Sequence, residues 1–229
     1  DEVARRTAIK RFEREAQATA ALRSPYTVEL YDFGVTEDLT FYYVMELLEG
    51  LDLKQLVTRF GPLLQARAIH LLKQVCHSLH DAHHAGMVHR DIKPENILTC
   101  RRGHDYDVVK VLDFGLVSAA ANPDVGRTQL TVEGTISGTP AFMAPEIASG
   151  EHVIDGRADL YALGCVAYWL LTGLVVFDGP SPMAVVLKHV NEPPAPPSSR
   201  TANPIHPELE AIVLACLAKD PARRPATGL

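Results

Sequence analysis

The sequence has few cysteines, no long hydrophobic segment and no excess of positive charge. Its four cysteines include no CxxC pair, so neither a disulfide framework nor a zinc site is indicated, and a reducing compartment is expected. The longest apolar run, Leu160 to Leu171, has Asp159 at its edge and is shorter than the roughly 20 residues that cross a bilayer. We therefore expect a buried core helix there.

The charge balance is acidic. Lys and Arg number 22 against 28 Asp and Glu, a net charge of -6. This acidic balance disfavours sequence-independent binding to nucleic acid and binding to an anionic membrane. The 229 residues, 47% of them hydrophobic, suffice for one domain with a substantial core. No signal-peptide pattern precedes the first helix, and because the chain begins with Asp1 we expect further residues upstream.

Hydrophobic periodicity predicts one helix and a pair of strands near the beginning of the chain. Val3 to Leu22 lacks Pro and Gly and is predicted to form an amphipathic helix. The β-rich runs Val28–Phe33 and Thr40–Glu46 are predicted to pair antiparallel. Ser118–Ser137 has no clear period and is expected to be a long loop. Further helices are predicted over Leu53–Phe60, Gln65–His84, Arg157–Leu171, Ser181–Val190 and Pro207–Ala218, and short apolar segments over Asn96–Thr99 and Val108–Leu112.

The densest group of reactive side chains lies in the segment Val88–Leu98. Asp91, Lys93 and Asn96 stand within six positions, and Asp113 follows a short apolar strand. A metal-bound nucleotide needs hard oxygen ligands, a cation for the transferring phosphate and a carboxylate that orients the attacking hydroxyl. Asp113 with Asn96, Lys93 and Asp91 could supply these functions in that order.

This segment resembles the catalytic and magnesium loops of the protein kinase family. Gly138–Glu146 resembles the family's peptide-binding loop, which ends in Ala-Pro-Glu. Asp159 falls where the family has its central-helix Asp, and Arg224 falls at its late Arg. The resemblance covers essentially the whole chain, in the family's order and spacing. It implies an α+β, two-lobed kinase fold with an incomplete small β-containing lobe and a larger helical lobe.

The resemblance also implies roles for the reactive residues. Asp91 would orient the substrate hydroxyl or accept its proton, and Lys93 would neutralise charge on the moving phosphoryl group. Asn96 and Asp113 would hold Mg²⁺. Lys93, two residues after Asp91, is similar to the pattern of Ser/Thr kinases, in which Thr139 would help to place the catalytic Asp and Lys.

ATP would bind between the lobes if the resemblance holds. Met45 is expected at the gatekeeper position beside the adenine. The Glu46 carbonyl and the Leu48 amide would bond the adenine edge. Asp52 would reach the ribose, and Leu98 would form the floor of the nucleotide site.

The phosphate-anchoring half of the family's site is incomplete in this sequence. Glu15 resembles the helix Glu that pairs with a Lys on a preceding strand, but that Lys is absent. Lys10 lies only five residues before Glu15, so it is expected in the same helix and not on a strand. No Gly-rich phosphate loop is present either, which fits an N-terminally truncated kinase domain.

Two further expectations concern regulation and stability. Arg90, directly before Asp91, suggests control by a phosphate in the following loop. Glu146 and Arg224 are expected to form a buried ion pair, and Asp159 to brace the loop backbone before Asp91. The candidate phosphorylation sites are Thr128, Thr131, Thr135 and Ser137, with Thr131 and Thr135 preferred.

The sequence is therefore identified as a bacterial-type Ser/Thr protein kinase domain over 1–229, with a partial small lobe (1–48) and a helical large lobe (49–229). It implies ATP and Mg²⁺ as cofactors, protein substrates, a possible homodimer for autophosphorylation and no nucleic-acid partner. A cytoplasmic location is expected, either free or as the cytoplasmic domain of a membrane-anchored receptor kinase. The alternatives are a pseudokinase scaffold, favoured if the missing Lys and Gly-rich loop are truly absent, and a small-molecule kinase, disfavoured by the Thr-rich loop.

Overall fold

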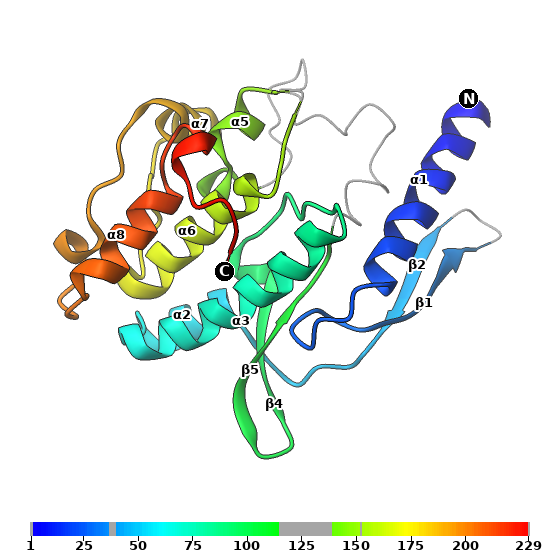
Figure 1. Cartoon of the computed structure of the whole chain (residues 1–229), viewed down its shortest axis with the longest axis horizontal. Coiled ribbons are helices and arrows are strands. Elements are labelled where there is room, and N and C mark those ends of the chain that lie inside the picture. Colours follow the sequence, from blue (N-terminus) through cyan, green and yellow to red (C-terminus); the bar gives the residue numbers. More distant parts are fainter. Residues whose placement is uncertain (1, 37–39, 115–138, 152, 229) are drawn as a thin grey trace.

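The computed structural model describes residues 2–36, 40–114, 139–151 and 153–228; the side chains of 2–8, 11 and 15 are outside this description. A small part with one helix and two strands stands beside a larger, mainly helical part (Figure 1), which confirms the predicted α+β class. The elements are α1 (Glu2–Ala20), β1 (Leu30–Val35), β2 (Phe41–Met45), β3 (Gly50–Asp52), α2 (Leu53–Phe60), α3 (Gln65–His84), the 3-10 turn η1 (Pro94–Asn96), β4 (Ile97–Arg102), β5 (Asp105–Val111), the 3-10 turn η2 (Pro140–Phe142), α5 (Pro145–Ala148), α6 (Arg157–Thr172), α7 (Pro182–Asn191), the 3-10 turn η3 (Pro197–Arg200), α8 (Pro207–Cys216) and the 3-10 turn η4 (Pro221–Arg223).

The small part is held together by aromatic packing between α1 and the β1–β2 pair. The two strands are antiparallel, with Phe33 opposite Tyr43. Phe12 of α1 is fully buried, and its ring centroid lies 4.4 Å from that of Phe41 and 5.4 Å from that of Tyr43. The predicted apolar face of the first helix therefore covers the predicted strand pair.

A second sheet, in the order β3-β4-β5, opens the larger part. The short strand β3 is not anticipated by the sequence, which turns to helical periodicity after Gly50. Asp52 pairs with Leu98, and Leu98 pairs with Lys110. A Cβ at Gly50 would lie 2.0 Å from the backbone oxygen of Thr99, so only glycine permits this approach of β3 to β4.

Residues 26–28, between α1 and β1, are fastened to the larger part. The Val28 amide donates to the Val111 oxygen over 2.9 Å, and the Val111 amide donates to the Tyr26 oxygen over 2.8 Å. The hydroxyls of Thr27 and Ser78 lie 2.7 Å apart, which adds a bond to α3. The segment that directly precedes β1 in the sequence is thus bound to β5 and α3.

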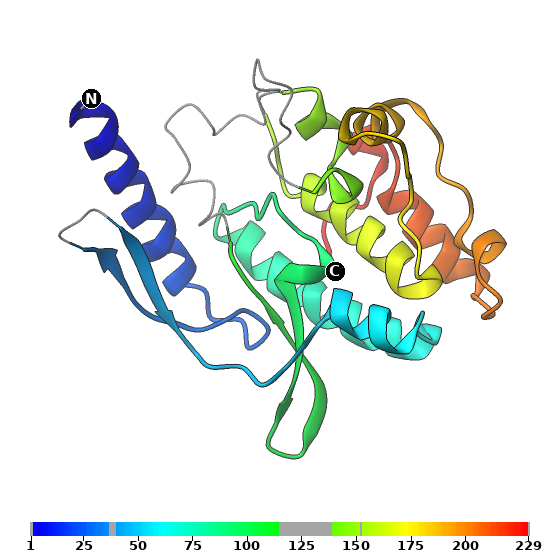
Figure 2. The ribbon, with the colours of Figure 1, turned by 180° about the vertical axis from the view of Figure 1, so that it is seen from behind.

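The core of the larger part is built around α6. All residues of this helix except Arg157 and Trp169 are buried, which confirms the expected core helix. α3 packs against α6 and against β5, and the view from behind shows it crossing between them (Figure 2). α6 ends at Gly173, whose φ of 72° is the left-handed conformation that favours glycine. Within the described residues, no helix has both the length and the apolar character needed to cross a membrane.

Candidate active site

The backbone before Asp91 is held by one buried carboxylate. Asp159, at the start of α6, accepts hydrogen bonds from the amides of His89 and Arg90, each over 2.8 Å. The Nε2 atom of His83 lies 2.8 Å from the same carboxylate. Arg90 has a φ of 66°, a conformation uncommon outside glycine. The expected bracing role of Asp159 is confirmed, whereas the contribution of His83 is not visible in the sequence.

His89 ties the Asp91 loop (residues 88–96) to the strand that precedes Asp113. Its Nε2 atom lies 2.8 Å from the Leu112 oxygen, and its Nδ1 atom accepts from the Asp91 amide over 3.3 Å. Because Nδ1 accepts a hydrogen bond, the ring hydrogen of the neutral imidazole is on Nε2, which donates to the Leu112 oxygen. The His89 ring also packs against Phe114 with ring centroids 4.6 Å apart. The loop and the Asp113 strand are therefore positioned together.

Asp91 is the centre of a compact polar cluster. The Lys93 Nζ donates to Asp91 Oδ2 over 2.6 Å. The Asn96 Nδ2 donates to the backbone oxygen of Asp91 over 2.8 Å and to Oδ2 over 3.0 Å. Among the described residues, no hydrogen bond to the other carboxylate oxygen, Oδ1, is recorded. The side chain of Asp91 is 38% exposed, so this oxygen is available to an incoming hydroxyl.

Asp113 lies beside this cluster with a φ of 58°. Burial raises the pKa of its carboxyl above the usual value, and the negative charge of Asp91 acts in the same direction, while His89 and Lys93 lower it. A half-buried carboxylate with incomplete charge compensation is suited to a divalent cation. Because Asn96 donates through Nδ2, its amide oxygen stays available as a ligand. The residues present therefore fit Mg²⁺, which prefers such oxygen ligands.

The residues expected around adenine lie at the end of β2 and directly after it. Met45, at the end of that strand, is half-buried, as is Leu48. Asp52 caps α2, with its Oδ1 accepting from the Gln55 amide over 2.7 Å. Leu98 is the register partner of Asp52, so the residues expected at the ribose and at the floor of the nucleotide site are neighbours.

The Glu46 side chain has a role that the sequence does not indicate. It forms an ion pair with Lys110 of β5 over 2.5 Å and accepts from the Glu29 amide over 2.9 Å. Lys110 Nζ also donates to the Thr27 oxygen over 3.2 Å. Burial on its own raises the pKa of Glu46, but the hydrogen bonds from Lys110 and Glu29 outweigh it, so the pKa is lowered. The only signal in the sequence is a lysine within an apolar strand segment.

Other expected site residues are not joined to the Asp91 cluster by a recorded contact. Thr139 is half-buried and precedes η2; among the described residues it makes no recorded hydrogen bond to Asp91 or Lys93. Lys10 lies within α1 and is exposed, as the spacing predicts. Glu15 also lies within α1, but its side chain falls outside the described residues. The same holds for Thr128, Thr131, Thr135 and Ser137.

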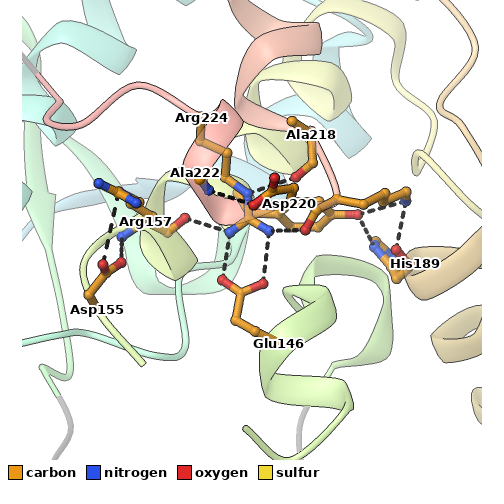
Figure 3. A network of polar contacts seen from close by, with 10 residues as sticks. Glu146, Asp155, Arg157, His189, Ala218, Asp220, Ala222 and Arg224 are labelled. Atoms are coloured by element: carbon orange, nitrogen blue, oxygen red, sulfur yellow. Dashed lines mark hydrogen bonds and ion pairs between the residues drawn. The ribbon is translucent and has the colours of Figure 1, made fainter. Parts of the chain in front are cut away.

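The predicted ion pair between Glu146 and Arg224 is confirmed (Figure 3). Two parallel bonds of 2.5 and 2.8 Å join the guanidinium to the carboxylate. The remaining N–H groups donate to the backbone oxygens of Ala218, Arg157 and Lys219. All five N–H donors of this buried arginine are therefore satisfied, and the pair fixes α5 to the end of the helical part.

Sequence comparison gives matches over nearly the whole chain. The protein kinase domain family matches residues 1–228. Serine/threonine-protein kinase pkn3 of Myxococcus xanthus is 42% identical, over 96% of this chain and 40% of its own length. Serine/threonine-protein kinase PknB of Mycolicibacterium smegmatis is 43% identical, over 95% of this chain and 34% of its own. The chain spans less than half the length of these relatives.

Solved structures show the same architecture. Rad53 1-466 in complex with AMP-PNP matches with a TM-score of 0.77 and 26% identity, over 96% of this chain and 52% of that one. The Mycobacterium tuberculosis PknI kinase domain matches with a TM-score of 0.71 and 27% identity, over all of this chain and 76% of that one. Since the motifs, the two-part fold and the sequence matches all agree, the chain belongs to the protein kinase family.

Proposed function

We propose that this chain transfers the γ-phosphoryl group of ATP to Ser and Thr hydroxyls of protein substrates. The observation that carries the proposal is the arrangement around Asp91. One carboxylate oxygen is held by Lys93 and Asn96, and the other is left for a hydroxyl. The relatives named above carry the name serine/threonine-protein kinase, and AMP-PNP is bound in the Rad53 complex.

In the proposed reaction, Asp91 Oδ1 accepts a hydrogen bond from the substrate hydroxyl and orients it. It takes the hydroxyl proton as the new O–P bond forms and the bond from the γ-phosphorus to the bridging oxygen breaks, with ADP as the leaving group. Lys93 neutralises charge on the transferring phosphoryl group. The carboxylate of Asp113 and the amide oxygen of Asn96 would hold Mg²⁺. When bound, the cation neutralises phosphate charge. Asp159 and His89 keep the loop backbone fixed while these side chains act.

We assign the nucleotide to the boundary between a small lobe (1–48) and a large lobe (49–229). Met45, the backbone of Glu46 and Leu48, Asp52 and Leu98 would contact adenine and ribose. Glu15 would face the phosphate-anchoring lysine of the family, and Thr139 would help to place Asp91 and Lys93. The register pairing of Asp52 with Leu98 supports the placing of these two residues at one site.

Regulation, assembly and location are further parts of the proposal. Arg90 adjoins Asp91 and would pair with a phosphate on Thr128, Thr131, Thr135 or Ser137, which phosphopeptide mapping of an active preparation would detect. A homodimer would allow autophosphorylation in trans. We assign a cytoplasmic location, either free or as the cytoplasmic domain of a membrane-anchored kinase.

The decisive experiment compares Asp91→Asn with Asp105→Asn in the full-length natural protein. Asp105 lies exposed at the start of β5, on the β4–β5 hairpin, so this variant makes the same chemical change away from the site. With ATP, Mg²⁺ and a Ser/Thr peptide mixture, Asp91→Asn should lower kcat by about 10²- to 10⁴-fold, with an unchanged melting temperature. Asp105→Asn should retain wild-type activity.

Equal phosphorylation by the wild type and Asp91→Asn would remove the mechanism. No phosphorylation by a folded wild-type protein would instead favour the pseudokinase scaffold. Phosphate found on a small-molecule acceptor but never on peptide would favour a small-molecule kinase. Phosphoamino-acid analysis of the peptide product should give phosphoserine or phosphothreonine.

A further inference from the structure

Two histidines stand one turn apart at the end of α3, and the proposed reaction uses neither of them. His80 and His84 are four residues apart, a spacing that places side chains on the same face of a helix. Their ring centroids lie 4.1 Å apart, with the ring planes at 48° to one another. His84 is exposed and His80 is half-buried, so dissolved ions can reach the pair. Two histidines at this helical spacing are a recurrent way of binding a metal ion.

The helix backbone fixes which nitrogen of His84 is free. The Nδ1 atom lies 3.0 Å from the backbone oxygen of His80. A carbonyl oxygen only accepts, so Nδ1 carries the hydrogen and donates it. In the neutral ring, Nε2 then holds a lone pair. Metal-bound histidines are commonly oriented by this kind of bond from the second ring nitrogen to a carbonyl.

The other histidines near the end of α3 are occupied, whereas this pair is not. His83 Nε2 lies 2.8 Å from the Asp159 carboxylate, and the ring of His77 packs against Tyr26 at a centroid distance of 5.9 Å. Among the described residues, no hydrogen bond or ion pair is recorded to the ring of His80 or to Nε2 of His84. No protein group therefore competes for these nitrogens.

The position at the end of the helix favours a cation. α3 ends at His84, and the carbonyl groups of a last helical turn give it a partial negative charge. Residues 80–84 contain no Lys or Arg, so no permanent side-chain cation of this turn offsets that charge. The net charge of the chain, -6, also attracts cations to its surface.

The ligand type selects the kind of cation. Imidazole nitrogen suits Zn²⁺, Ni²⁺ and Cu²⁺, whereas Mg²⁺ prefers oxygen ligands. Zn²⁺ binds an imidazole nitrogen at about 2.0 to 2.1 Å, so two rings at this separation can share one ion after small side-chain rotations. Among the described residues, no group of three or more His, Cys, Asp and Glu is placed to hold a metal. Water would therefore complete the coordination, and the ion would exchange with solvent.

We propose that His80 and His84 form a surface site for one divalent transition-metal ion, bound by Nε2 of His84 and a ring nitrogen of His80. The site is distinct from the Mg²⁺ ligands proposed at Asn96 and Asp113, and it does not depend on phosphoryl transfer. The ion would link two successive turns of α3. It would thereby stabilise the turn that also carries His83, the residue in contact with Asp159.

Calorimetric titration with Ni²⁺ tests the site in the full-length natural protein, with excess Mg²⁺ present to occupy oxygen ligands. His80→Gln and His84→Gln should each weaken Ni²⁺ binding at this site about tenfold or more, because even loss of a group that only orients a ligand costs 10- to 100-fold. The matched control is His104→Gln, at an exposed histidine between β4 and β5. This variant should bind Ni²⁺ at the site as the wild type does.

The double variant separates one shared ion from two independent histidines. If one ion needs both rings, His80→Gln combined with His84→Gln should lose little more affinity than either single change, because the two effects are not additive. If each single change instead halves the number of bound ions and leaves their affinity unchanged, the histidines act separately and the proposal is overturned. Equal binding by the wild type and His84→Gln would overturn it as well.

Hydrogen–deuterium exchange locates the bound ion. The Ala85 amide donates to the Asp81 oxygen over 3.1 Å and closes α3. Ni²⁺ should slow its exchange in the wild type and in His104→Gln, because the ion restrains the last turn, but not in His84→Gln. Mg²⁺ at the same concentration should have no such effect. Unchanged exchange in the Ni²⁺-saturated wild type would overturn the proposal, whether or not the protein phosphorylates peptides.

Discussion

Two ion pairs hold different regions of this molecule, and they are built differently. Glu146–Arg224 lies wholly within the helical part; the Arg224 side chain is fully buried, and every N–H of its guanidinium has an acceptor. Glu46–Lys110 joins the connector after β2 to β5, and the Glu46 side chain is 15% exposed. The first pair is sealed from water, whereas the second is partly open to it.

The difference in exposure to water fits different requirements of the two regions. A sealed pair costs much to break, because the remaining partner stays buried and charged. Such a pair suits a region that must present the Asp91 loop and η2 in one geometry. A partly hydrated pair is weaker and depends on solution conditions. It suits the junction between the two parts, where the proposed nucleotide site lies.

The largest expected effect is on the sealed pair. Arg224→Ala should lower the free energy of unfolding by about 3 to 5 kcal/mol, since Glu146 is left buried without its cation. Arg223→Ala, at the exposed neighbouring position, removes the same side chain and should have little effect. Urea unfolding measures both. Similar losses for the two variants would show that the buried ion pair of Arg224 is not the source of the effect.

A smaller loss is expected at the connector. Lys110→Met should destabilise the protein by about 1 to 3 kcal/mol, because Glu46 loses its partner but can still reach water. The control is Lys54→Met, in an exposed pair with Glu95, where the change should stay within about 0.5 kcal/mol. Adding Glu46→Gln to Lys110→Met should recover part of the loss in a double-mutant cycle. Strict additivity would show that the two side chains do not interact.

The smallest effect concerns pH. The folded-state pKa of Glu46 lies below its ordinary value of 4.5, so its ionised form stabilises the native state above that pH. The stability difference between the wild type and Glu46→Gln should be constant near neutral pH. It should then shrink as the pH falls below about 4.5, through the lowered pKa. A difference that grows on acidification would reverse the sign and refute the assignment.

Helices with clear periodicity were predictable to within a few residues. Leu53–Phe60 and Gln65–His84 agree with α2 and α3 at both ends, because apolar spacing and flanking turn residues both mark them. β3 was not predictable. Its three residues carry no period of their own, and they become a strand only because Gly50 allows close approach to Thr99.

Within the candidate site, too, some contacts were predictable from the sequence and others were not. Asp91, Lys93, Asn96 and Asp113 are close in sequence or follow a recognisable strand, so their grouping was predictable. The contact of His83 with Asp159 and that of Lys110 with Glu46 join residues distant in sequence. Apart from the position of Lys110 in an apolar segment, nothing local marks these pairs, since each depends on how α3, α6 and β5 pack. Thr139 and Glu15 stay predictions.

The close approach of Gly50 to β4 also limits how the two parts can rotate. The connector is fastened at Glu46 by Lys110 and at Gly50 by strand pairing with Cys100 of β4, which leaves only Leu47 to Glu49 between the two points. Each residue offers two soft backbone torsions, and residues 26–28 fasten the other crossing to β5. The chain passes between the two parts at these two fixed places, and the line through them is an axis about which the parts could rotate. Since the proposed adenine contacts fall within 46–48, a bound nucleotide would restrict the same few backbone torsions.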